Sequence, residues 1–169
     1  MREIREFIIH CSDSDFGDAE TIDRWHRERG WSGIGYHYVI LNGVVAAHGE
    51  YDAKRDGEIQ IGRLVDRQGA HCEGHNAHSV GICLIGRKHF TGQQLYKALP
   101  NLLMLWLATF PEMTTDSIRA HYEYNPGKTC PNIDIDLIRE DLRRRIAVKK
   151  LEEKVREYEA KLSNRKDDD

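Results

Sequence analysis

The chain has 169 residues, 40% of them hydrophobic, which fits one globular domain with a sizeable core and room for a tail. The net charge of -3 argues against a protein that mainly coats nucleic acid, so nucleic acid is not expected among its partners. Charges at positions 2, 3, 5 and 6 surround only a short apolar run, so we expect no signal peptide, no membrane span and a cytoplasmic location.

The first predicted strand covers residues 4–11, which are rich in branched and aromatic side chains. Strand alternation places Phe7 and Ile9 on one face and His10 on the other. A helix is expected to begin within residues 18–21 and to end at Gly30.

Residues 36–41 and 44–48 are predicted to form a hairpin about the Asn42-Gly43 turn. The following segment, residues 50–69, has a weaker pattern, with short extended pieces expected near Ile59 and Leu64.

The second half of the domain predicts a buried strand, a long helix and a short strand. Residues 78–86 form a continuous apolar run, typical of a strand buried on both faces. Residues 91–111 predict a helix that Pro100 would kink or divide. A last strand at residues 116–121 leads into a loop. This order of elements predicts an α/β fold with a mixed central sheet flanked by helices.

From Asp134 onward the pattern changes to a highly charged helix. Its apolar residues recur at spacings of 3, 4, 3 and 4 over about two heptads, and are Val148, Leu151, Val155, Tyr158 and Leu162. This stripe predicts a helix that lies on its own domain or extends into solvent, or alternatively one that self-associates or binds a partner. We expect a domain at residues 1–147 and a helical tail at 148–169 with a disordered end at 164–169.

Three side chains from opposite ends of the domain form a candidate metal site. His121 and Cys130 flank a Pro-Gly turn, and His10 stands at the carboxyl end of the first strand. Two imidazoles and a thiolate suit zinc, and three protein ligands leave one position open for chemistry on water or a carbonyl group. Each residue alone also has a structural interpretation, as a satisfied histidine or a small buried hydrophobe. The four cysteines have no CxxC spacing, which disfavours a zinc ribbon.

Four segments resemble the zinc-dependent N-acetylmuramoyl-L-alanine amidases of the phage-lysozyme and peptidoglycan-recognition-protein kind. In chain order they read FIIHCSDSD, GWSGIGYHYVI, GAHCEGHNAHSVGICLIG and RAHYEYNPGKTCP. The resemblance spans residues 4–136 and implies the fold of that family, one Zn²⁺ ion held by His10, His121 and Cys130, and peptidoglycan as substrate. The reaction implied is hydrolysis of the amide between N-acetylmuramic acid and L-alanine.

The resemblance also implies roles for residues that would look ordinary alone. Tyr36 and Lys128 are implied to assist the reaction, although their pattern also fits a strand aromatic and a solvated lysine. His71 and Asn76 match the family's groove segment and are candidates for sugar or peptide contacts. His37 should face away from Tyr36 if the strand is regular, which favours packing, with substrate contact as the alternative.

Three rival functions belong to other classes or settings. Relatives that bind peptidoglycan without cutting it typically lack the cysteine ligand, whereas Cys130 is present here. Phage members of the family can also restrain a phage RNA polymerase, a role for which the C-terminal helix is the candidate region. Cytoplasmic recycling amidases more often carry an acidic residue where Tyr36 stands. We therefore expect a phage endolysin that is made in the host cytoplasm and reaches the cell wall through a holin or an equivalent leak.

Overall fold

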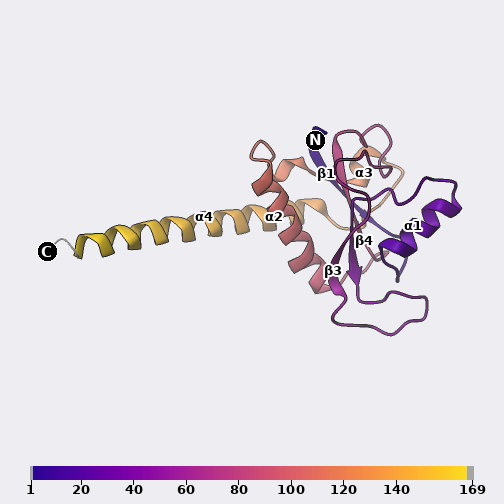
Figure 1. Cartoon of the computed structure of the whole chain (residues 1–169), viewed down its shortest axis with the longest axis horizontal. Coiled ribbons are helices and arrows are strands. Elements are labelled where there is room, and N and C mark those ends of the chain that lie inside the picture. Colours follow the sequence, from indigo (N-terminus) through magenta and orange to yellow (C-terminus); the bar gives the residue numbers. More distant parts are fainter. Residues whose placement is uncertain (1, 167–169) are drawn as a thin grey trace.

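The computed structural model describes residues 2–166 and has a mixed sheet at its centre (Figure 1). The strands are β1 (Glu6–Cys11), β2 (Tyr38–Asn42), β3 (Asp56–Ile61), β4 (Ser79–Leu84) and β5 (Ile118–Ala120). Their order in the sheet is β3-β2-β4-β1-β5. Among the five strands of residues 2–166, β2 and β3 are the one antiparallel pair; the pairs β1–β4, β1–β5 and β2–β4 are parallel. The predicted mixed sheet flanked by helices is confirmed.

Helices cover both faces of the sheet. They are α1 (Ala19–Glu28), the π-helical η1 (Gln94–Ala98), α2 (Leu99–Thr109), the 3₁₀-helical η2 (Thr115–Ser117), α3 (His121–Tyr124) and α4 (Ile135–Lys166). The larger core lies between one sheet face and α2 with the start of α4, and includes Phe7, Ile82, Leu103 and Leu142. A smaller core lies between the other face and α1, where Ile22 packs near Cys83.

Local chemistry explains where the helices begin and bend. The Asp18 side chain caps α1 by accepting a hydrogen bond from the Thr21 N–H (2.9 Å). Before Pro100, which has no N–H to donate, the chain widens into the π-helical turn η1, and Leu99 donates its N–H to the Gln94 carbonyl. The long predicted helix therefore continues through Pro100, which lies in the first turn of α2; the π-helical and α-helical parts meet between Ala98 and Leu99, so the helix is not divided at the proline.

The predicted hairpin has the wrong second strand. β2 pairs with β3, whereas residues 44–48 form an irregular loop. A two-residue type I′ turn needs a positive φ at both central residues, and of Asn42 and Gly43 only the glycine has one, at 87°. The Asn42 side-chain oxygen instead accepts a hydrogen bond within the loop (3.0 Å). The extended piece expected near Ile59 is β3, and the one expected near Leu64 is not a strand.

α4 is one continuous helix that leaves the body of the molecule and runs outward (Figure 1). Its first turns bury Ile135, Ile138 and Leu142 in the larger core. The stripe that begins at Val148 is exposed and does not lie on its own domain. The helix reaches Lys166, inside the end predicted to be disordered, and residues 167–169 of that prediction lie outside the described residues. Within residues 2–166, no helix has the length and apolar character needed to cross a membrane.

Candidate metal centre and substrate groove

Parallel strand pairing brings the two candidate histidine ligands together. β1 and β5 run side by side with Ile9 opposite Ala120, and His10 and His121 are the next residue in each chain segment. Because the carboxyl ends of parallel strands meet at the same edge of a sheet, both imidazoles emerge there. Their ring centroids lie 4.6 Å apart.

The loop after α3 returns Cys130 to the same point. The Tyr122 N–H donates to the Cys130 carbonyl (2.9 Å), and the Lys128 N–H closes the Pro-Gly turn by donating to the Asn125 carbonyl (2.9 Å). The Cys11 N–H, at the end of β1, points at the Cys130 sulfur (3.3 Å). These bonds fix both ends of the loop, so the sulfur is held beside the two imidazoles.

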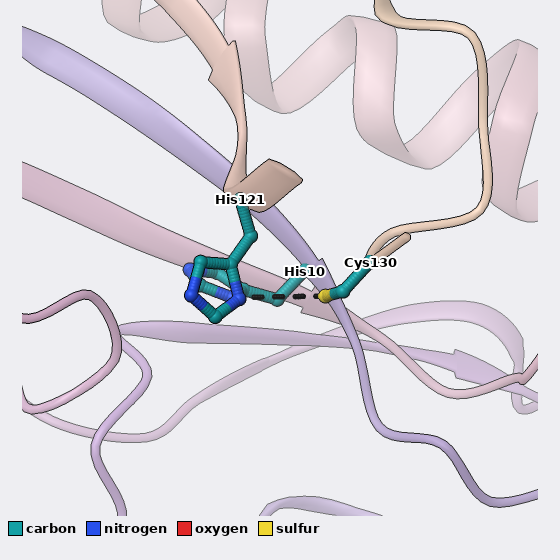
Figure 2. Close-up of side chains that lie close together, drawn as sticks. All are labelled: His10, His121 and Cys130. Carbon is teal, nitrogen blue, oxygen red and sulfur yellow. Dashed lines mark hydrogen bonds between the residues drawn. The ribbon is translucent and has the colours of Figure 1, made fainter. Parts of the chain in front are cut away.

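The ligand atoms of His10, His121 and Cys130 all lie within 4.8 Å of one another (Figure 2). The Cys130 sulfur is 3.9 Å from Nδ1 of His10. Tetrahedral zinc holds nitrogen and sulfur ligands at about 2.0–2.3 Å, which separates neighbouring ligands by about 3.3–3.7 Å. Small side-chain adjustments would meet that geometry, so the three residues fit a metal ion. In the described part of the chain no other three His, Cys, Asp or Glu residues form such a group.

The electrostatics of the three groups also favour a cation. Burial lowers the pKa of His10 well below its ordinary value, with His71 and His121 adding to the effect. Burial and then the Lys128 charge lower the pKa of His121. Both imidazoles are therefore neutral near pH 7 and free to ligate. The Cys11 side chain and burial raise the pKa of the Cys130 thiol, so its thiolate needs a nearby positive charge.

A chain of hydrogen bonds runs from His10 into the sheet. With Nδ1 of His10 facing the sulfur, Nε2 of His10 donates to Nδ1 of His71 (3.1 Å). Nε2 of His71 then faces the Ser79 hydroxyl (3.4 Å), which donates to the His75 carbonyl (2.7 Å). In this series of hydrogen bonds, every donor meets an acceptor. The His71 ring is 9% exposed and lies against Gly81, where an added Cβ would approach it to 2.5 Å.

Tyr36 and His37 lie near the same cluster, contrary to the expectation of opposite faces. The His71 ring lies 6.4 Å from the Tyr36 ring and 5.6 Å from the His37 ring. The reason is that β2 begins only at Tyr38, so strand alternation does not apply to the two preceding residues. Tyr36 packs against His10 at 5.1 Å, and burial raises the pKa of its phenol well above the usual range.

His37 is completely buried and has partners for both ring nitrogens. Nδ1 accepts from the Gly81 N–H (2.9 Å), and Nε2 lies 3.0 Å from the Arg67 carbonyl. Burial lowers its pKa to about 4. These contacts agree with the packing role favoured for His37, and its contact with substrate stays a prediction.

A groove of about 620 Å³ opens beside this candidate metal centre. His121 and His71 line it together with Asn76, whose side-chain oxygen accepts from the N–H groups of His71 (2.7 Å) and Cys72 (2.9 Å). Asn76 thus shapes the groove loop. Lys128 lies on the exposed loop and lines a neighbouring hollow of about 650 Å³.

The same groove contains two aromatic residues that sequence reasoning missed. Trp31, 43% exposed, and Tyr124 both line it. Trp31 packs on His26, whose Nδ1 accepts from the Gly35 N–H (3.0 Å). The available signal was the position of these aromatics inside the segments GWSG and HYEYN, next to residues already singled out.

Comparisons with known proteins identify the family of this chain. The family model described as N-acetylmuramoyl-L-alanine amidase matches residues 1–133. The endolysin of Enterobacteria phage K11 is 35% identical over 146 residues, which cover 79% of this chain and 84% of that protein. The endolysin of Escherichia phage T7 is 33% identical over 147 residues, covering 80% and 85%.

Solved structures show the same fold. The N-acetylmuramoyl-L-alanine amidase LysC from Clostridium intestinale URNW superposes with a TM-score of 0.69 at 26% identity, covering 84% of this chain and 87% of that one. Wild-type Drosophila PGRP-LB gives 0.59 at 25% identity, covering 78% and 76%. The family model matches most of the chain, and the structure brings two histidines and one cysteine together. This chain belongs to the N-acetylmuramoyl-L-alanine amidase family.

Proposed function

We propose that the chain is a zinc-dependent amidase that cleaves the bond between N-acetylmuramic acid and L-alanine in peptidoglycan, as a phage endolysin. The observation that carries this proposal is the convergence of His10, His121 and Cys130 within 4.8 Å, with His121 lining an open groove. In the reaction, a water oxygen bonds to the lactyl carbonyl carbon and the carbon–nitrogen bond breaks. The leaving nitrogen of L-alanine takes up a proton.

Zinc is the ion that this donor set fits best. Neutral imidazoles and a thiolate are borderline and soft ligands that suit Zn²⁺ better than Mg²⁺ or Ca²⁺. A zinc ion held here would supply Lewis-acid chemistry, acidifying water and polarising the scissile carbonyl. The chain itself supplies the orientation of the ligands and the polar groups around them.

Lys128 and Tyr36 are proposed to act on the reacting atoms. The Lys128 ammonium is close enough to His121 to lower its pKa, so its charge reaches the metal centre. There it would stabilise the negative charge that grows on the carbonyl oxygen. The Tyr36 phenol stays protonated and packs on His10, so it can donate a hydrogen bond to the water or pass a proton towards the leaving amine.

His71 is proposed to act through His10 as a positioning residue as well as at the groove wall. By accepting from Nε2 of His10, it fixes the ring tautomer in which Nδ1 carries the free lone pair. Asn76 holds the loop that carries His71, and both residues remain candidates for contact with sugar or peptide. His37 supports the same region because its Nδ1 accepts a hydrogen bond from the Gly81 N–H.

The biological setting is proposed from relatives. The phage K11 and phage T7 proteins are endolysins, and we propose the same role here, with synthesis in the host cytoplasm and access to the wall through a holin or an equivalent leak. A phenol at position 36, where recycling amidases more often carry an acid, favours the endolysin.

Digestion of purified sacculi tests the proposal. The expected products are stem peptides with a free L-alanine amine and glycan strands with intact lactyl groups, identified by mass spectrometry. A chelator, or Cys130→Ser, should abolish their release, and added Zn²⁺ should restore activity only to the chelated wild type. Products cut within the glycan or the peptide, or full activity after metal removal, would overturn the proposal. Binding to sacculi without any product would favour a recognition module instead.

A further inference from the structure

The part of α4 beyond the domain carries an unpartnered apolar stripe, here called the seam. It consists of Val148, Leu151, Val155, Tyr158 and Leu162, which are 55%, 62%, 49%, 65% and 43% exposed. None of these five belongs to either core cluster. A helix projecting into water gains little from five large exposed apolar side chains on one side, so the pattern indicates a surface that a partner covers.

The seam faces away from the domain on which the first turns of α4 pack. Leu142 is completely buried in the core, and Leu151 follows it nine residues later, about two and a half helical turns, which places it on the opposite side of the helix. The seam therefore cannot fold back onto its own domain while α4 stays continuous. Figure 1 shows that α4 runs outward from the rest of the fold, which leaves the seam open to a second helix.

The residues along the seam favour a second copy of the same helix. In heptad terms Val148, Val155 and Leu162 occupy a positions, and Leu151 and Tyr158 occupy d positions. The valines at a positions and Leu151 at d match the combination that favours two-helix coiled coils in parallel pairs, whereas Leu162 at a and Tyr158 at d lie outside it. The rest of residues 148–163 carries five basic and four acidic side chains, a balance that does not suit an anionic bilayer.

The charges beside the seam select the orientation of the pair. The e positions are acidic (Glu152, Glu159) and the g positions are basic (Lys154, Lys161). In a parallel pair, a g residue faces the e residue five positions further along the other helix, so Lys154 meets Glu159 of the second copy. In an antiparallel pair, g faces g and e faces e, which would oppose lysine to lysine and glutamate to glutamate.

We propose that two copies of this chain associate through the seam as a parallel two-stranded coiled coil. About two heptads make a short interface, so the association should be weak and should depend on protein concentration. The parallel orientation places both domains at the same end of the pair. If the proposed amidase function holds, the two grooves can engage one peptidoglycan layer together, and the second binding event becomes intramolecular.

Sedimentation equilibrium of the full chain from about 5 to 500 μM tests the association independently of catalysis. The wild type should shift from monomer to dimer across this range. Val155→Lys should weaken dimerisation at least 10-fold, whereas Ser163→Lys, which adds the same charge off the seam at a b position, should not. Because Val155 is exposed, the thermal stability of the monomer should stay unchanged.

Charge exchange tests the orientation. Lys154→Glu should weaken a parallel dimer, because the introduced carboxylate would face Glu159 of the second copy, and the double variant with Glu159→Lys should restore it. A stronger dimer in Lys154→Glu alone would show the antiparallel arrangement and overturn the proposal. A monomer at every concentration, or a dimer unaffected by Val155→Lys, would also overturn it, as would seam-dependent binding to phosphatidylglycerol vesicles by a protein that stays monomeric.

Discussion

Replacing His71 with phenylalanine tests how the proposed ligand His10 is positioned, while all three proposed ligands stay in place. The substitution keeps an aromatic ring of similar shape beside Gly81 but removes the Nδ1 acceptor that Nε2 of His10 faces at 3.1 Å. None of the three proposed ligands is changed. The expected result is a protein that folds normally and binds zinc more weakly.

The structure bounds the size of this effect. His10 is 1% exposed, so water does not readily replace the lost acceptor, and the ring loses the group that fixes its tautomer. Groups that orient metal-bound histidines typically contribute 10- to 100-fold to metal affinity. The dissociation constant for zinc should therefore rise by about that factor, which corresponds to about 1.4–2.7 kcal/mol.

A competition titration against a chromophoric chelator measures the affinity without any catalytic readout. His71→Asn is the rescue variant, because its side-chain oxygen can accept near the position of Nδ1 and should recover part of the loss. His78→Ala, at an exposed histidine of the same segment, is the matched control. Wild-type affinity in His71→Phe, with the fold intact, would refute the positioning role.

Four further outcomes are expected. Lys128→Ala should keep zinc and the fold but lower turnover on sacculi about 10²- to 10³-fold, and near-normal turnover would remove its charge from the mechanism. Cys130→Ser should lower zinc affinity by roughly two orders of magnitude or more, measured by metal analysis after dialysis. Arg139→Ala should lower the free energy of unfolding in urea by about 3 kcal/mol, because the buried guanidinium pairs with Glu123 (2.9 Å) and holds the α3 turn; a loss below 1 kcal/mol would contradict this. The metal-free protein should lose stability as the pH falls from about 6.5 towards 4, because burial lowers the pKa of several histidines, to about 4 for His26 and His37, and the unfolded chain binds these protons first; a flat profile in that range would count against it.

Local sequence patterns were enough to predict most of the helices and strands and the proposed set of metal ligands. The strands at β1, β4 and β5 and the capped helix α1 follow from apolar runs and capping residues that act over a few positions. His10, His121 and Cys130 were singled out by residue type and by their positions at a strand end and a turn. The parallel pairing of β1 with β5 brings the two histidines together, and the loop after α3 returns Cys130 to them.

The tertiary structure decided how segments that are distant in the chain lie relative to one another. The partner of β2 is β3 rather than residues 44–48, because the backbone at Asn42 does not adopt the tight turn that the dipeptide favours. Tyr36 and His37 lie near one cluster because β2 begins after them. The link from His10 through His71 to Ser79 depends on Gly81 leaving room for a ring.

The apolar stripe of α4 shows the same difference between what the sequence determines and what the fold determines. Its spacing was legible in the sequence, but whether it is covered depends on where the helix leaves the core, and Leu142 marks that point. Periodicity along a chain is a local property, whereas burial and pairing depend on which surfaces meet in three dimensions.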